Sequence, residues 1–458
     1  MNFRSMEKNT HSFNLIEGPV GNTLLRFSLP FMASTLLQTL YSTTDTIVVG
    51  QCLGSPGLSA VSNASQLMQL LYMVCVGFSS AGQVLIAQAV GAGNYEKVQK
   101  VIHTLFVSEL LLSLATGMIC MVFARPLLTI LSTPKEAAAQ AAYYIIICGT
   151  GMVFTGLYNM FSAILRGCGD SRHPLLFVAI ASVINIILDL LFIAGFGWNV
   201  AGAALATIIG QLFSVIFSFY FCKKHADALH FSLNLRELRI DSEANRQLIR
   251  IGVPLAVQSG AVQLSFLFVS RMVNTLGLTV SAAFGAAQKL RNIPGILGQG
   301  LSLGCASMIG QNWGARKNER VSSTVRWGLL YSFIINAVFT AIFAAAPILC
   351  FRMFTQDASV LTYAPMCIFA LIAERPGQWL MAPCNALVNA QGFVKFSIIV
   401  GFVDAFVGRI FLCWFFGTYL HMGALGFFLG YSGGTYLTAI PVFIYYVTGL
   451  WKRRSVLS

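Results

Sequence analysis

The sequence predicts an all-α integral membrane protein, with twelve transmembrane helices in two six-helix bundles related by a pseudo-twofold axis. Of its 458 residues, 56% are hydrophobic and only 10% are charged, against roughly 25% charged residues in an ordinary soluble domain. The apolar residues form continuous runs without a period of two, and a helix that crosses a bilayer needs about 20 of them. A soluble fold could not cover this much apolar surface, so the composition excludes cytosolic enzymes, DNA-binding proteins and secreted disulfide scaffolds.

Twelve apolar runs are long enough to be spans. The first follows the polar segment MNFRSMEKNTHSF, which lacks the pattern of a cleavable signal peptide, so we expect this first run to be retained. In chain order the predicted helices cover residues 24–50, 57–89, 97–124, 137–165, 174–197, 200–222, 247–274, 281–310, 322–346, 359–388, 396–418 and 423–449.

The strongly polar stretch at residues 223–246 lies at the middle of the chain. It predicts a division into an N-terminal lobe of six helices (1–222), a cytoplasmic linker (223–246) and a C-terminal lobe of six helices (247–458).

The two predicted lobes repeat one sequence pattern. At an offset of 223 residues, Leu53-Gly54 aligns with Leu276-Gly277, and Gly77 aligns with Gly300. Because six is an even number of spans, both copies start from the same side of the membrane. The axis that relates them therefore lies along the membrane normal, as it does in transporters built from parallel repeats, and rocking of two bundles around a cleft is the natural use of that geometry.

The distribution of basic residues predicts the orientation. The chain has 29 Lys and Arg against 16 Asp and Glu, a net charge of +13. When the N-terminus is placed inside, only Arg125, Lys135 and Arg352 fall on the outer side. Cytoplasmic loops carry such an excess of Lys and Arg, so we expect twelve spans with both termini in the cytoplasm. The family resemblance described below implies that this membrane is the bacterial cytoplasmic (inner) membrane. The basic residues then require no nucleic-acid partner.

Sequence motifs for catalysis or for a bound cofactor are absent. There is no GxxxxGK[ST] phosphate-binding loop and no HExxH pair, and the 11 cysteines include no CxxC. We therefore expect neither an enzyme nor a primary pump. Active transport would draw its energy from an ion gradient, with H⁺ or Na⁺ as the coupling ion and no other cofactor.

Four polar residues of the N-terminal lobe are expected at one depth in the outer half of the membrane. Asp45 lies near the outer end of the first helix, Asp189 near the outer end of the fifth, Asn185 one turn from Asp189, and Thr207 on the sixth. Their oxygens could hold Na⁺, their two carboxyl groups could share a proton, or each acid could simply pair to hold helices together. The aligned positions of the second half carry no acid, which favours a functional ion site.

The C-terminal lobe has polar residues of mixed sign within its predicted spans. Internal ion pairs would account for them, and cavity-lining or coupling roles are the alternative, with Glu374 and Asp404 as the best candidates. On the first helix, Pro30 is a candidate hinge, since a kink there could respond to the charge of Asp45. The candidate polar site in this lobe comprises Arg271, Lys289, Arg291, Glu374 and Asp404, with Arg375 and Arg409 nearby in sequence.

Several motifs resemble the multidrug and toxic compound extrusion (MATE) family along nearly the whole chain. They are the P-x14-D run that ends in DTIVVGQCLG, VGAGNYEKV at 90–98 with its echo WGARKNERV at 313–321, ILRGCGDSRHP at 164–174 and AGAALAT at 201–207. The residues that match the N-lobe cation site of the DNA-damage-inducible (DinF-type) branch are Tyr41, Asp45, Asn185, Asp189 and Thr207. A sodium site of the NorM type in the C-terminal lobe is not expected, because the seventh helix has no acid.

The resemblance implies a secondary active antiporter that exports amphipathic, mostly cationic compounds in exchange for H⁺ or Na⁺. Expected partners are drug-like small molecules and the lipid bilayer, and we expect a monomer. A flippase for lipid-linked saccharides from the same superfamily is the first alternative. A receptor or channel that does not transport actively is the second, and the asymmetric acids of the duplicated halves argue against it.

Overall fold

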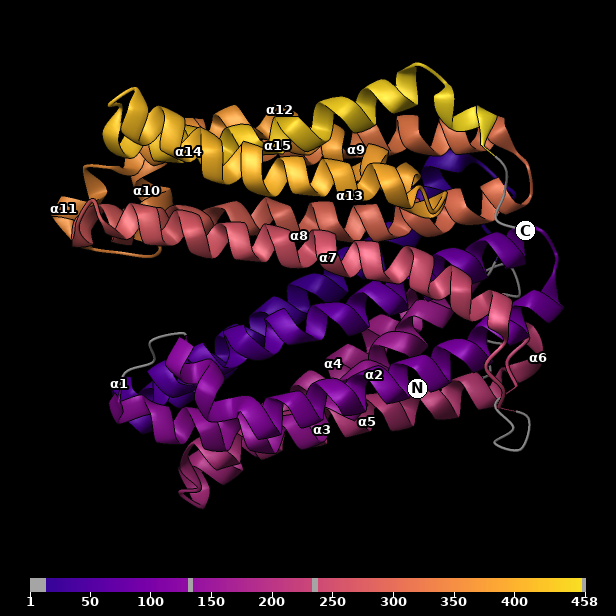
Figure 1. The fold of residues 1–458 in the computed structure, drawn as a ribbon, viewed down its shortest axis with the longest axis horizontal. Helices are drawn as coiled ribbons and strands as arrows, with labels where there is room; N and C mark the ends of the chain where they lie inside the picture. Colours follow the sequence, from indigo (N-terminus) through magenta and orange to yellow (C-terminus); the bar gives the residue numbers. More distant parts are fainter. Residues whose placement is uncertain (1–13, 131–134, 233–237, 455–458) are drawn as a thin grey trace. The chain divides into compact units, whose positions relative to one another are not determined.

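The protein is described by a computed structural model that covers residues 14–130, 135–232 and 238–454 (Figure 1). These ranges contain helices and no β-strand. The helices are α1 (Val20–Gly91), α2 (Tyr95–Ile130), α3 (Lys135–Cys168), α4 (Arg172–Asp189), α5 (Asn199–Lys224), α6 (Ala226–Leu229), α7 (Ser242–Asn274), α8 (Leu278–Gly314), α9 (Asn318–Ala345), α10 (Pro347–Arg352), α11 (Ala358–Leu361), α12 (Ala364–Ala390), α13 (Val394–Phe402), α14 (Leu412–Trp414) and α15 (Gly423–Val447). Three segments are π-helical, namely η3 (Leu190–Gly195), η4 (Val403–Phe411) and η5 (Phe415–Tyr419), and η6 (Leu450–Arg453) is a 3₁₀ turn.

This set of helices confirms the predicted all-α membrane fold. Within the described ranges, ten helices are long and apolar enough to cross a bilayer. Two more long helices, residues 20–53 of α1 and α12, are more polar because they carry candidate site residues such as Asp45 and Glu374. Several helices extend a few residues past the predicted bounds. Only the apolar length of a span is set by the bilayer, whereas its backbone hydrogen bonds can continue into water.

The helix α1 is two predicted spans joined at Gly54. That residue has φ 66° and ψ −164°, which is outside the helical region. At the aligned position of the second half, Gly277 has φ 104° directly before α8. Both backbones lie at positive φ, where a Cβ atom is strained, so glycine at these two positions serves the same sharp turn between spans.

The chain divides into two compact units. Unit 1 consists mainly of Ala33–Ala256, and unit 2 consists of Ile16–Met32 and Val257–Ser458. Within unit 1, α3 packs against α2 and α5, and within unit 2, α12 packs against α8, α9 and α15 (Figure 1). The predicted lobes, 1–222 and 247–458, differ from these units in that the first part of α1 belongs to unit 2 and the first part of α7 to unit 1.

Close helix packing accounts for this exchange. In unit 1, a Cβ atom on Gly77 would lie 2.5 Å from the carbonyl oxygen of Gly252 on α7. In unit 2, a Cβ atom on the aligned Gly300 would lie 2.6 Å from the backbone nitrogen of Met32 on α1. In each copy of the repeat, therefore, a glycine allows close contact with the first helix of the other half of the sequence. This packing is a physical reason for the repeat at these two positions.

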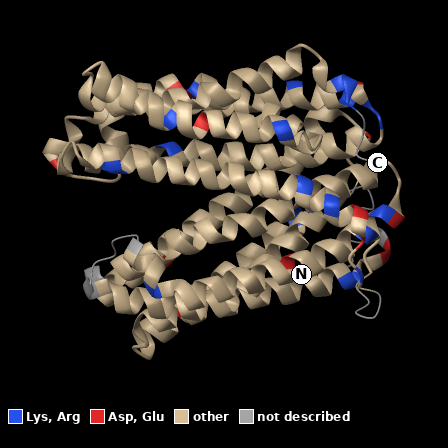
Figure 2. Ribbon diagram, in the orientation of Figure 1, with Lys and Arg blue, Asp and Glu red and all other residues tan. Residues whose placement is uncertain are grey.

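The segment after α5 packs against the helices of unit 1. The ring of His230 stacks on Tyr95 at the start of α2, with 3.6 Å between ring centroids. Thr104 accepts a hydrogen bond from the backbone nitrogen of Asp241 at 3.0 Å. The described parts of the predicted linker 223–246 thus pack on the helix ends of unit 1, and Lys223 and Lys224 form part of the last turn of α5. Figure 2 shows Lys and Arg at this end of unit 1, where α6 lies in Figure 1.

Candidate functional site

Polar residues from three helices of unit 1 meet at the predicted N-lobe site. Asp45 comes from α1, Asp189 is the last residue of α4, and Thr207 lies on α5. The Asp45 and Asp189 carboxyl groups are close enough to interact electrostatically with each other. The Tyr41 hydroxyl is within reach of Thr207 and close to both acids. The structure therefore brings together four of the five residues that the sequence singled out.

The fifth residue, Asn185, lies one helical turn before Asp189 and is 2% exposed. It packs opposite Gly210 of α5, where an added Cβ atom would lie 3.2 Å from the Asn185 Cβ. Neither the oxygen nor the nitrogen of its amide has a hydrogen-bond partner among the described residues. The glycine lets α5 approach α4 closely, which keeps this amide buried one helical turn from Asp189.

The acids of this site lack a compensating charge. In the described part of the chain, no Lys, Arg or His forms an ion pair with Asp45 or Asp189. Among the residues that the structure describes, Asp45 Oδ1 and both carboxyl oxygens of Asp189 have no hydrogen-bond partner, although Asp189 is fully buried. Buried polar atoms are almost always satisfied, and an unpaired carboxylate within a membrane is expensive. This arrangement can accept a proton or a small cation through its oxygens.

The backbone changes character directly after Asp189. The chain leaves the α-helical α4 there and enters η3, and η5 occupies nearly the aligned positions of the second half. Such π-helical segments often mark functional sites. In unit 2 the position aligned with Asp189 is Leu412, so a π-helical segment occurs there without an acid. The π-helical segment is therefore a feature of the repeat, whereas Asp45 and Asp189 are present in unit 1 alone of the two aligned copies.

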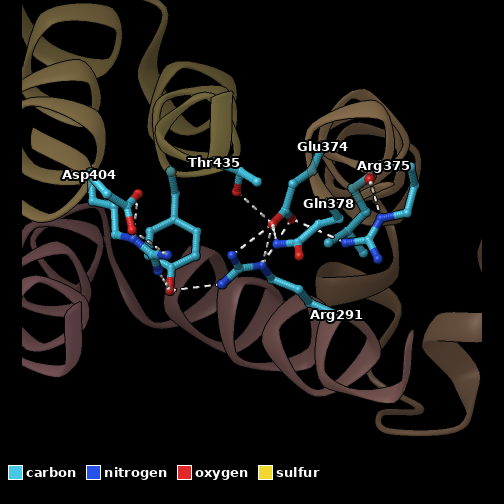
Figure 3. Close-up of polar contacts among 9 residues, drawn as sticks. Arg291, Glu374, Arg375, Gln378, Asp404 and Thr435 are labelled. Atoms are coloured by element: carbon cyan, nitrogen blue, oxygen red, sulfur yellow. Dashed lines mark hydrogen bonds and ion pairs between the residues drawn. The ribbon is translucent and has the colours of Figure 1, made fainter. Parts of the chain in front are cut away.

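The polar residues of unit 2 form a different kind of cluster (Figure 3). Arg291 of α8 and Glu374 of α12 make a two-pronged ion pair, with Nη2 to Oε1 at 2.7 Å and Nε to Oε2 at 2.9 Å. Three more groups donate to the same carboxylate, namely Arg375 Nη2 at 3.2 Å, Gln378 Nε2 at 2.8 Å and Thr435 Oγ1 at 3.0 Å. Glu374 is fully buried and both of its oxygens are occupied.

A tyrosine links this pair to a second one. The Tyr431 hydroxyl accepts hydrogen bonds from Arg291 Nη1 at 3.0 Å and from Arg409 Nη1 at 2.8 Å. Arg409 also pairs with Asp404 at 3.2 Å, and both belong to the π-helical η4. Three arginines therefore face two acids. These contacts are internal ion pairs, which is one of the two alternatives that the sequence left open for the charged residues of this lobe.

Two predicted members of the C-lobe site lie outside this cluster. Arg271 is exposed, and Lys289 is exposed with its ammonium 5.9 Å from the ring centroid of Phe354. Conversely, Gln378, Tyr431 and Thr435 belong to the cluster but are not among the site residues that the sequence predicts. Spacing could have found Gln378, since it is four residues after Glu374 and such residues are neighbours on a helix. Tyr431 and Thr435 carry no signal in the sequence that separates them from other residues of α15.

The candidate hinge, Pro30, lies inside continuous helix. Within α1 the non-helical backbone dihedrals are at Gly54 rather than at Pro30. Pro30 nonetheless lies just before Met32 and Ala33, where α1 passes from unit 2 to unit 1. On α7, Pro254 lies just before the corresponding change at Ala256. Proline removes one backbone hydrogen bond from a helix, so both helices have a point of low bending resistance at the change of unit.

Comparisons with known proteins agree with this fold. A family model described as MatE matches residues 30–191 and 254–415, so it matches each half of the chain once. The chain is 25% identical over 442 residues to a probable multidrug resistance protein, YoeA, of Bacillus subtilis, and this alignment covers 95% of each of the two proteins. It is also 25% identical over 329 residues to the multidrug export protein MepA of Staphylococcus aureus, covering 71% of this chain and 72% of MepA.

A solved structure shares the architecture over nearly the full length. It is described as the outward-facing conformation of a multidrug resistance MATE family transporter, and it superposes with a TM-score of 0.90 at 22% identity, covering 97% of this chain and 99% of that one. The family model covers more than half of the sequence, and the helix arrangement agrees with it. The chain belongs to the MATE family of membrane transporters.

Proposed function

We propose that this protein is a secondary active antiporter that exports amphipathic, mostly cationic compounds in exchange for H⁺ or Na⁺. The observation that carries the proposal is the pair of acids without a counter-charge, Asp45 and Asp189, beside Tyr41, Asn185 and Thr207. The relatives named for multidrug resistance or export support the class of substrate. Nothing in the structure or among these relatives favours the flippase alternative.

The proposed coupling follows from electrostatics. Two neighbouring carboxylates repel each other when both are ionised, and a bound proton or Na⁺ removes that repulsion. The loaded and unloaded sites therefore favour different positions of the α1 segment that carries Asp45. We propose that α1 adjusts at Pro30 when this happens. By linkage, if the cation weakens drug binding by some factor, the drug weakens cation binding by the same factor.

A binding experiment tests this coupling directly. Purified protein is titrated with a fluorescent lipophilic cation across a range of pH and of Na⁺ concentration. We expect dye affinity to fall as pH is lowered or as Na⁺ is raised, because each loads the Asp45–Asp189 site. Asp45→Asn resembles the neutral acid and should flatten this dependence. Dye affinity of the wild type that ignores both ions would contradict antiport through this site.

The orientation is proposed from the distribution of Lys and Arg, with both termini and residues 223–246 in the cytoplasm of a bacterial cell and the protein in its cytoplasmic membrane. Cysteine labelling of intact cells with an impermeant thiol reagent tests it. Among the described cysteines, Cys52 is the exposed one and lies near the predicted outer end of the first span. We expect Cys52 to be labelled, and Lys223→Cys in a Cys52→Ser background to stay unlabelled. Labelling at position 223 from outside would reverse the orientation.

A further inference from the structure

A second acid is buried in unit 1, apart from the Asp45–Asp189 site. Glu109 lies on α2 and is 0% exposed. Its Oε1 accepts a hydrogen bond from Ser79 Oγ of α1 at 2.7 Å. Its other oxygen, Oε2, is buried and has no hydrogen-bond partner among the described residues. The proposed antiport mechanism does not use this carboxyl group.

Among the described residues, none supplies a balancing charge to Glu109. The titratable groups that face it are Tyr72 and Cys75 of α1, and both are neutral in their ordinary form. From α3 it is faced by Gly156, where an added Cβ atom would lie 3.6 Å from Oε2. None of the ion pairs in the described residues includes Glu109. A carboxyl group in such a place is stable as the neutral acid, because an unpaired buried charge is strongly disfavoured.

The number of oxygen atoms argues for a proton rather than a metal ion. Hard cations bound by proteins take several oxygen ligands, about six or more for Ca²⁺. Beside the free oxygen of Glu109 the structure places Gly156 and Ser113, and the Ser113 hydroxyl is already bonded to the Glu109 backbone carbonyl. Among the described residues, no group of three or more His, Cys, Asp or Glu side chains could hold a metal ion. A single carboxyl group with one hydroxyl donor suits a proton.

Polar side chains continue from Glu109 along the contact of α1 with α3. Tyr72 accepts a hydrogen bond from Asn159, and Gln83 accepts one from Arg166 at 2.8 Å. Toward the Asp45–Asp189 site, Tyr144 of α3 interacts with Ser65 of α1 and lies near Asp45. On α1 these positions share one helix face, because residues three, four and seven apart align. We call this set, Ser65, Tyr72, Ser79 and Gln83 with Tyr144, Asn159 and Arg166, the polar seam.

The repeat shows that the helix packing does not require the acid. The residue of unit 2 aligned with Glu109 is Ser332, and the one aligned with Gly156 is Trp379. Ser302, aligned with Ser79, donates instead to the backbone carbonyl of Ala382 at 3.2 Å. Unit 2 thus packs the same three helices without a carboxyl group at this place, so Glu109 has a role other than holding them together.

We propose that Glu109 is a second proton-binding site of unit 1, which carries its proton in this conformation and exchanges it along the polar seam. The site binds H⁺ on the carboxyl group of Glu109, with Ser79 fixing the orientation of that group. It is separate from the Asp45–Asp189 site and needs no drug substrate to be observed.

Infrared spectroscopy of the purified, intact protein tests the proposal without any transport assay. A protonated carboxyl group has a carbonyl band that shifts in deuterated water and disappears when the proton leaves. At neutral pH we expect the difference between wild type and Glu109→Gln to contain one such band. Raising the pH should remove it reversibly. In Ser79→Ala the band should remain at a shifted frequency, because the hydrogen bond to Oε1 is gone.

Other outcomes overturn the proposal. A carboxylate band for Glu109 at neutral pH would show an ionised group, and a band that persists unchanged to the alkaline limit of stability would show a permanently neutral structural acid. The same measurement in Asp45→Asn separates this site from the coupling site, since the Glu109 band should survive there even if antiport is lost. If Glu109→Gln does not fold, the pH titration of wild type against Ser79→Ala still identifies the band by its frequency shift.

Discussion

Asp45→Asn and Asp189→Asn are each expected to reduce dye export to the level of cells that lack the protein, while the protein still reaches the membrane. Each change leaves one carboxyl group where the structure has two that interact electrostatically. An amide of the same shape cannot take up a proton and contributes no charge to hold Na⁺. The site can then no longer alternate between a repelling and a relieved state, which is what couples ion to drug. Accumulation of a fluorescent cationic dye, normalised to membrane-inserted protein, measures the effect.

A nearby substitution on the same helix provides the control. Thr46 is exposed, and its hydroxyl bonds to the Ser42 carbonyl of its own helix at 2.7 Å. Thr46→Ala should therefore export normally. Thr207→Val should give an intermediate loss, because it removes one oxygen ligand near Tyr41 but no charge. Normal export by Asp45→Asn would show that the coupling ion binds elsewhere.

Glu374→Gln is expected to destabilise unit 2 strongly, by about 3–5 kcal/mol, because it leaves Arg291 and Arg375 as buried charges without their acid. The carboxylate of Glu374 is fully buried and receives donors from three helices, α8, α12 and α15. We expect a large fall in the unfolding temperature of the detergent-purified protein and a lower yield. Export per folded molecule should change less than in Asp45→Asn.

Matched variants separate the ion pair from its neighbouring hydrogen bonds. Thr435→Val removes one donor to Glu374 and should cost about 1 kcal/mol. Adding Arg291→Met to Glu374→Gln removes the orphaned cation and should recover part of the lost stability, since a buried pair replaced as a whole is tolerated better than a broken one. A stable Glu374→Gln that fails to export would instead assign Glu374 to the transport reaction.

These two expectations follow from opposite kinds of electrostatics. In unit 1, Asp45 and Asp189 are short of partners, so their charge is free to change with the bound ion. In unit 2, Glu374 and Asp404 are paired with arginines, so their charge is held. A duplicated fold with one unsatisfied and one saturated half can assign ion coupling to the first and rigidity to the second.

The spans, the repeat and the candidate residues of the N-lobe site could be predicted from the sequence alone. Bilayer thickness imposes a length on each apolar run, so the helices could be counted and bounded to within a few residues. Asp45, Asn185, Asp189 and Thr207 could be placed at one depth because rise per residue converts sequence position into height along a helix. Height along the membrane is a local property, and local properties can be read from the chain.

The contacts that depend on how helices turn toward one another could not be predicted from the sequence and are seen only in the folded structure. Arg291 and Glu374 are 83 positions apart, and no periodicity tells which guanidinium meets which carboxylate. The same holds for the exchange of first helices at Gly77 and Gly300, and for the isolation of Glu109. Each depends on the rotation of a helix about its axis and on the choice of its neighbour, which are set by side-chain packing over the whole unit rather than by any segment alone.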